Sequence, residues 1–149
     1  MNQMLAQPWV DPAHIIVAGW SRGGFLSVVY AARHPEKVAG VINFSGGWRS
    51  EWAPGSRAGE DRLMLAAAGK TARVPELWLY AANDMYYSLP YTQKIFDAFL
   101  ANGGTGDFLA FGTIHGVPAT VVGNGHALFE HVGMWEAAVA AYLLRVGGG

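Results

Sequence analysis

A serine in the hexapeptide GWSRGG is well placed to act as a nucleophile. Ser21 follows the short apolar run HIIVAG and precedes a stretch with apolar residues at helical spacing. A strand that turns directly into a helix can hold a serine in a strained conformation and project its hydroxyl above a sheet. A serine that caps a helix in a flexible turn gives a similar local pattern, so the context of the motif must decide.

An acid that supports such a serine is expected after a strand. A serine hydroxyl needs a histidine to accept its proton and usually a carboxylate to orient that histidine. In a parallel sheet these groups lie at the carboxyl ends of the strands. Asp84, in AAND after the apolar run ELWLYAA, meets this condition, whereas Asp107 precedes its expected strand, Asp97 lies within a helix and Asp61 opens one. Asp84 is therefore the predicted acid, with a simple turn residue as the alternative.

The sequence contains five histidines, and one of them fits the base best. His14 starts a strand at the wrong end of the sheet, and His34 lies at the end of a helix. His115, His126 and His131 all follow the last expected strand, but His131 belongs with the final helix. His126 lies in the glycine-rich segment VGNGHALF, which can fold an imidazole over the nucleophile. We predict His126 in preference to His115, with a polar loop residue as the alternative.

Short apolar runs alternate with helical patterns along the chain and predict an α/β fold. Because the strand runs are continuously apolar, we expect a parallel four-stranded sheet with helices on both faces. The expected strands are 14–19, 38–44, 76–82 and 107–111. The expected helices are 22–33, 61–68, 89–102 and 132–146. Residues 1–146 are predicted to form a single domain, followed by a glycine tail at 147–149.

Composition excludes several classes of partner. The formal net charge of −1 comes without a basic block, so neither nucleic acid nor an anionic membrane is an expected partner. The sequence has no membrane-spanning apolar run and no signal-peptide pattern at its start, so a cytoplasmic location is the default expectation. It lacks cysteine, and we find no phosphate-binding, dinucleotide-binding or metal motif. We therefore expect no cofactor and no metal, and a small neutral molecule as the partner.

Four segments together resemble the dienelactone hydrolase family of the α/β-hydrolase superfamily, over its C-terminal half. They are WVDPAHIIVAGWSRGG, VINFSGGW, PELWLYAANDMYYS and NGHALF. The order Ser21, Asp84, His126 is also that of α/β-hydrolases. The resemblance implies a carboxylic ester or lactone hydrolase in which Ser21 attacks, His126 acts as base and then acid, and Asp84 holds the imidazole. Typical members use a cysteine nucleophile, so the serine favours a general esterase.

Two other interpretations remain open. The GWSxGG form also resembles prolyl-oligopeptidase-like serine peptidases, but their usual HG-x-x-D context around the acid is replaced here by AAND. A peptidase is therefore the second choice. The third is a non-catalytic fragment or oligomerisation module that retains the three residues.

The resemblance also predicts the surroundings of the nucleophile. The backbone N–H of Arg22 is the expected donor to the oxyanion. In the superfamily a second donor comes from a loop in the first half of the fold, so weak activity is expected here. Trp20, Trp48 and Tyr86, together with Trp52, are expected to form an apolar site for small esters, although aromatic residues also fill cores.

The first strand is expected to lie at an edge of the sheet. In the superfamily, earlier strands precede the elbow strand, so residues 14–19 would expose an apolar edge. We expect a homodimer in which two copies pair these edges. The alternative is that the chain is a fragment of a longer protein.

Overall fold

The structure, a computed structural model, describes residues 2–50, 58–116 and 124–147 and confirms the α/β class. Within these residues the strands are β1 (Ile16–Trp20), β2 (Gly40–Phe44), β3 (Pro75–Ala81) and β4 (Thr105–Phe111). They form one sheet in the order β1-β2-β3-β4, and every neighbouring pair is parallel. Their carboxyl ends therefore all lie at the same edge of the sheet.

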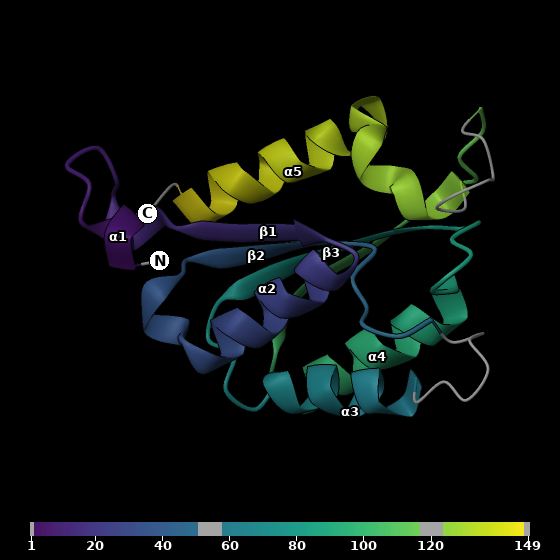
Figure 1. Ribbon diagram of the computed structural model, residues 1–149, viewed down its shortest axis with the longest axis horizontal. Helices are drawn as coiled ribbons and strands as arrows, with labels where there is room; N and C mark the ends of the chain where they lie inside the picture. The colour runs from purple at the N-terminus through teal and green to yellow at the C-terminus, as the bar shows by residue number, and fades with distance from the viewer. Residues whose placement is uncertain (1, 51–57, 117–123, 148–149) are drawn as a thin grey trace.

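Helices cover both faces of the sheet (Figure 1). In chain order they are α1 (Asn2–Leu5), α2 (Arg22–Arg33), α3 (Ala58–Ala68), α4 (Leu89–Ala101) and α5 (Val132–Gly147), with 3₁₀ helices η1 (Pro12–His14), η2 (Pro35–Lys37) and η3 (Asn124–Glu130). The helices α2, α3 and α4 lie on one face, and α5 lies on the other. None of the described helices has the length and apolarity that crossing a membrane requires.

Alternate side chains of β3 supply the middle of two hydrophobic cores. Trp78 and Tyr80 pack on the side of α2, α3 and α4, with Phe99 of α4 fully buried beside them. Leu77 and Leu79 pack on the opposite side with Tyr142 of α5. Since both faces are covered, the strands read as continuous apolar runs, which is why the class was evident from the sequence.

Several predicted boundaries shift by two or three residues. The first strand begins at Ile16 because Asp11, whose side chain accepts a hydrogen bond from the Ala13 N–H (2.9 Å), caps the short helix η1 before it. The last strand begins at Thr105, so Asp107 lies within β4 and not before it, and it forms an exposed ion pair with Arg145 (2.5 Å). The sequence GGTG before Asp107 looks like a turn. Its last glycine is instead in the strand.

The outer edge of β1 is open in the described part of the chain. In that part β1 pairs with β2 only. A groove of about 440 Å³ runs along this edge, lined by residues 15–18 of the strand region and by Leu26 and Tyr30 of α2, among others. Ala18, at the middle of β1, is exposed.

The last helix runs into the glycines at the end of the sequence. Gly147 is the last residue of α5, and residues 148–149 lie outside the described residues.

Candidate active site

Ser21 occupies a strained turn between β1 and α2. Its φ of 56° and ψ of −123° lie in a region that residues other than glycine rarely adopt. Backbone hydrogen bonds hold this conformation: the Ser21 N–H donates to the Phe44 carbonyl (2.9 Å), and the Ser21 carbonyl accepts from Phe25 (3.1 Å) and Gly47 (3.2 Å). The turn has the form of a nucleophile elbow, with its serine at the carboxyl edge of the sheet.

Two glycines around Ser21 are required by close packing. A Cβ at Gly19 would lie 2.2 Å from the backbone carbon of Gly23, and one at Gly24 would lie 2.2 Å from Oδ1 of Asn43. Gly23 behaves differently, because a Cβ there would meet nothing within 4 Å. The backbone of Gly23, and not its missing side chain, therefore leaves no room for a side chain at position 19.

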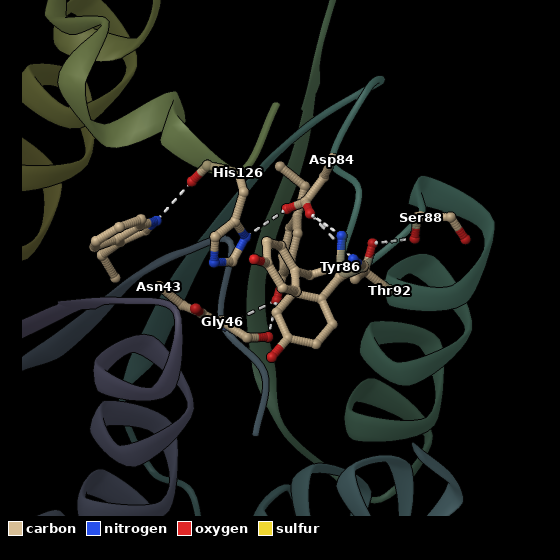
Figure 2. A network of polar contacts seen from close by, with 10 residues as sticks. Asn43, Gly46, Asp84, Tyr86, Ser88, Thr92 and His126 are labelled. Carbon is tan, nitrogen blue, oxygen red and sulfur yellow. Dashed lines mark hydrogen bonds and ion pairs between the residues drawn. The ribbon is translucent and has the colours of Figure 1, made fainter. Parts of the chain in front are cut away.

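Asp84 and His126 form a buried pair (Figure 2). Nδ1 of His126 lies 3.0 Å from Oδ2 of Asp84, and their side chains are 4% and 0% exposed. A carboxylate can only accept, so Nδ1 donates the proton of this contact. In a neutral imidazole this arrangement leaves Nε2 with its lone pair, which is the tautomer that a general base requires.

The two oxygens of Asp84 have different partners. Oδ1 accepts the backbone N–H groups of Tyr86 (2.8 Å) and Tyr87 (3.0 Å), while Oδ2 faces His126. Asp84 therefore closes the turn after β3 and also orients the histidine. The two interpretations of this residue that the sequence offered are compatible.

His126 lies in η3, where a glycine lets the segment approach Asp84. The Gly125 N–H donates to the Asn83 carbonyl (3.2 Å), and a Cβ at Gly125 would lie 2.2 Å from the Asp84 nitrogen. On the other side, Nε1–H of Trp20 donates to the His126 carbonyl (2.6 Å). Trp20 immediately precedes Ser21, so the segment of His126 is bonded to the residue next to the elbow serine.

The remaining histidines lie elsewhere. His14 is in η1 and His34 ends α2, both at the opposite end of β1 and α2 from Ser21. His115 is exposed after β4, and His131 directly precedes α5. Within the described residues, no three His, Asp or Glu side chains gather as a metal site would need.

Aromatic rings surround the His126 imidazole. The ring centroids of Tyr86, Trp20 and Tyr87 lie 4.7, 5.4 and 5.5 Å from it. Burial raises the pKa of the Tyr87 phenol, so Tyr87 is neutral at physiological pH. The histidine is thus held in a largely apolar environment, which strengthens its interaction with Asp84.

Trp48 lies in the loop after β2, on the side of α2. It is 40% exposed, and the Arg22 guanidinium lies 5.3 Å from its ring centroid. Asp61 of α3 fixes this loop, because Oδ2 of Asp61 accepts the N–H groups of Trp48 and Arg49, both at 2.8 Å. Burial raises the pKa of Asp61. Trp52 lies outside the described residues.

A polar network beneath the elbow was not predicted from the sequence. Nδ2 of Asn43 donates to the Tyr80 hydroxyl (3.2 Å), which donates to the Gly46 carbonyl (2.7 Å). All three are buried, and Figure 2 shows Asn43 and Gly46 below the histidine. An amide in the apolar run VINF was the only signal in the sequence. Asp61 and Gly125 were missed too, since loop anchoring and close approach leave no periodic pattern.

Several solved structures with a similar fold are named as hydrolases. A thermostable esterase aligns with 97% of this chain and 34% of its own, at 15% identity and a TM-score of 0.62. A Klebsiella pneumoniae protein provisionally described as a dienelactone hydrolase aligns over 73% of this chain and 43% of its own (20% identity, TM-score 0.56). Pyrococcus horikoshii acylaminoacyl peptidase aligns over 74% of this chain and 21% of its own, at 16% identity and a TM-score of 0.57.

These likenesses show the fold: the chain has part of an α/β-hydrolase fold. It spans less than two thirds of the length of each of these three structures. No protein-family model matches the chain, and no curated protein sequence does.

Proposed function

We propose that this protein is a serine hydrolase that cleaves small carboxylic esters through an acyl-enzyme. The observation that carries the proposal is the buried Asp84–His126 pair, which a hydrogen bond joins to Trp20, the residue before the strained Ser21. This is the set of groups that serine hydrolases need, in the chain order of α/β-hydrolases. The low-identity esterase and dienelactone hydrolase neighbours agree with it.

The proposed reaction follows from the roles of these groups. Nε2 of His126 takes the hydroxyl proton while Ser21 Oγ attacks the ester carbonyl. The imidazolium, stabilised by Asp84, then returns the proton to the departing alcohol. A water molecule repeats the sequence on the acyl-enzyme and frees the acid and Ser21.

The charge that develops on the carbonyl oxygen needs a donor. Arg22 is the first residue of α2, a helix of twelve residues, and its backbone N–H is our proposed donor. The partial positive charge at this helix end favours an oxyanion. Where one such donor has been removed from other enzymes, the rate falls by about a hundredfold to a thousandfold, so activity with one donor would be slow but measurable.

The proposed substrates are short- to medium-chain esters. The rings of Trp20 and Tyr86 pack against His126, and Trp48 is partly exposed in the loop after β2. Rings of this kind favour apolar acyl and alkoxy groups over charged ones.

A peptidase is the second candidate, because acylaminoacyl peptidase shares the fold. The two candidates are separated by comparing p-nitrophenyl butyrate with an acyl-alanine p-nitroanilide. We expect a higher kcat/KM for the ester. A higher value for the anilide would favour the peptidase.

Labelling by a fluorophosphonate tests the nucleophile, because the reagent captures only an activated hydroxyl. We expect the wild-type protein to be labelled and Ser21→Ala to remain unlabelled. Ser27→Ala is the matched control, since Ser27 is a buried serine of α2 whose hydroxyl donates to the Gly23 carbonyl. It should label like the wild type. A folded wild-type protein that does not react would instead support a non-catalytic module.

We also propose that a second copy of the chain covers the open edge of β1. Residues 15–19 carry no charge and no proline, the usual protections of an exposed edge. Antiparallel pairing about a two-fold axis through Ala18 would place both α2 helices on one face, over the groove and the half-exposed Leu26.

Light scattering tests this pairing. The wild-type protein should have the mass of a dimer, and Ala18→Lys that of a monomer. Ala110→Lys is the control, because Ala110 is an exposed alanine in the other edge strand, β4. A monomeric wild-type protein would contradict the proposal.

A further inference from the structure

We infer that Trp20 is a positioning residue, whose indole N–H sets the place of His126 relative to Ser21. The inference rests on the proposed function and names a residue on which that function depends. It goes beyond the apolar contact with substrate that we expect from Trp20 in the sequence.

A single hydrogen bond joins the backbone of the proposed base to the residue before the proposed nucleophile. Nε1–H of Trp20 donates to the backbone carbonyl of His126 at 2.6 Å, across 106 residues of chain. Trp20 is the last residue of β1 and is bonded to Ser21. Asp84, by contrast, follows β3, and β2 lies between β3 and the elbow strand β1. Trp20 therefore links the backbone of the histidine to the residue next to the serine.

Two other contacts hold His126: Nδ1 of its ring faces Oδ2 of Asp84, and the N–H of the preceding Gly125 donates to the Asn83 carbonyl (3.2 Å). Neither of them restrains the backbone of His126 at its own carbonyl. The Trp20 bond restrains that backbone at the carbonyl. The indole is itself held, because it packs against Phe129 of η3 with ring centroids 4.9 Å apart.

The direction of the indole N–H also limits what Trp20 does for a substrate. Its single donor is occupied by the His126 carbonyl, so it has no hydrogen bond to give to an ester. Trp20 acts on the reaction through His126 and, where a substrate touches it, through its ring alone.

Trp20→Phe tests the inference, because it keeps an aromatic ring and removes the donor. Trp135→Phe is a matched control. Nε1–H of Trp135 also donates to carbonyls of η3, those of Leu128 (3.1 Å) and Phe129 (3.3 Å), but not to that of His126. Each variant removes one indole N–H that donates to a carbonyl of η3. Only Trp20→Phe removes the donor to the carbonyl of His126 itself.

Ester kinetics give the first readout. For Trp20→Phe we expect kcat to fall about tenfold, the effect of one hydrogen bond, with KM changed less than about twofold. Trp135→Phe should keep kcat within about twofold of the wild type. A raised KM with unchanged kcat in Trp20→Phe would overturn the inference, because it would mean that Trp20 contacts substrate only. Equal losses of kcat in both variants would overturn it too.

The NMR signals of the His126 imidazole give a readout that needs no turnover. They should shift or broaden in Trp20→Phe and stay in place in Trp135→Phe. Unchanged signals in Trp20→Phe would refute the positioning role even if the protein hydrolyses esters. If the His126 signals shift in Trp20→Phe but the wild-type protein hydrolyses no ester, the result would support the positioning role and count against the proposed function.

Discussion

Glu76 is a carboxyl group that the fold holds without a charged partner, and its replacement should change how stability depends on pH. It lies in β3 and is fully buried. Oε2 accepts a hydrogen bond from Trp78 Nε1–H (2.7 Å), and Oε1 has no partner among the described residues. Burial raises the pKa of Glu76 from 4.5 to about 8. The side chain is therefore protonated in the folded protein at neutral pH.

The sign of the effect follows from proton binding. Between the two pKa values the folded state binds a proton that the unfolded state does not, so the free energy of unfolding falls as pH rises. This contribution is complete below the unfolded pKa of 4.5 and is lost by about pH 8. The slope is about 1.36 kcal/mol per pH unit, so a rise from about pH 5.5 to about pH 7.5 removes up to about 3 kcal/mol.

Glu76→Gln removes the titration and keeps an oxygen for Trp78. We would measure urea unfolding by circular dichroism for the wild type and the variant over this pH range. The difference between their free energies of unfolding isolates Glu76, because the other titrating groups are common to both. Glu136→Gln, which changes an exposed glutamate of α5, is the control and should leave the slope unchanged. Parallel curves for wild type and Glu76→Gln would refute the reasoning.

Further predictions concern the pair at the site. Asp84→Asn should lower kcat by about 10⁴-fold, because an amide can stabilise the wrong tautomer of His126. Esterase kinetics measure this loss. A loss of kcat below about tenfold would contradict the role assigned to Asp84. Gly125→Ala should destabilise the protein by more than about 1 kcal/mol, because its Cβ would lie 2.2 Å from the Asp84 nitrogen. Gly133→Ala in α5 is the control. A Cβ at Gly133 would have no atom within 4 Å, so this variant should be neutral or stabilising. Thermal melts of both variants measure this, and equal effects would contradict the packing argument.

The fold could be predicted because its signals are local, and local signals also single out three candidate site residues. Ser21 lies in a motif between an apolar run and a helical pattern, and Asp84 directly follows a strand. The rule that parallel strands gather their carboxyl ends then places both at one edge. His126 needed one further choice among histidines, which its glycine-rich surroundings decided. In the structure Nδ1 of His126 lies 3.0 Å from Oδ2 of Asp84, and the role of His126 as base stays a prediction.

The supporting contacts could not be predicted because they depend on three-dimensional packing. Asp61 looks like an ordinary residue at the start of a helix, yet from α3 its carboxylate accepts two backbone N–H groups of the loop that carries Trp48. The Trp20 indole reaches the His126 carbonyl over 106 residues. Gly106, where a Cβ would lie 2.1 Å from the Glu76 carbonyl oxygen, looks like part of a turn and lies in β4. No periodicity in the sequence marks such pairs.

The most direct test of the proposed serine hydrolase is the hydrolysis of short p-nitrophenyl esters by the purified protein and by Ser21→Ala. Both proteins should be checked for folding by circular dichroism in the same samples. We expect turnover by the wild type and none by Ser21→Ala. A folded wild type without turnover, or a Ser21→Ala variant with the wild-type rate, would contradict it.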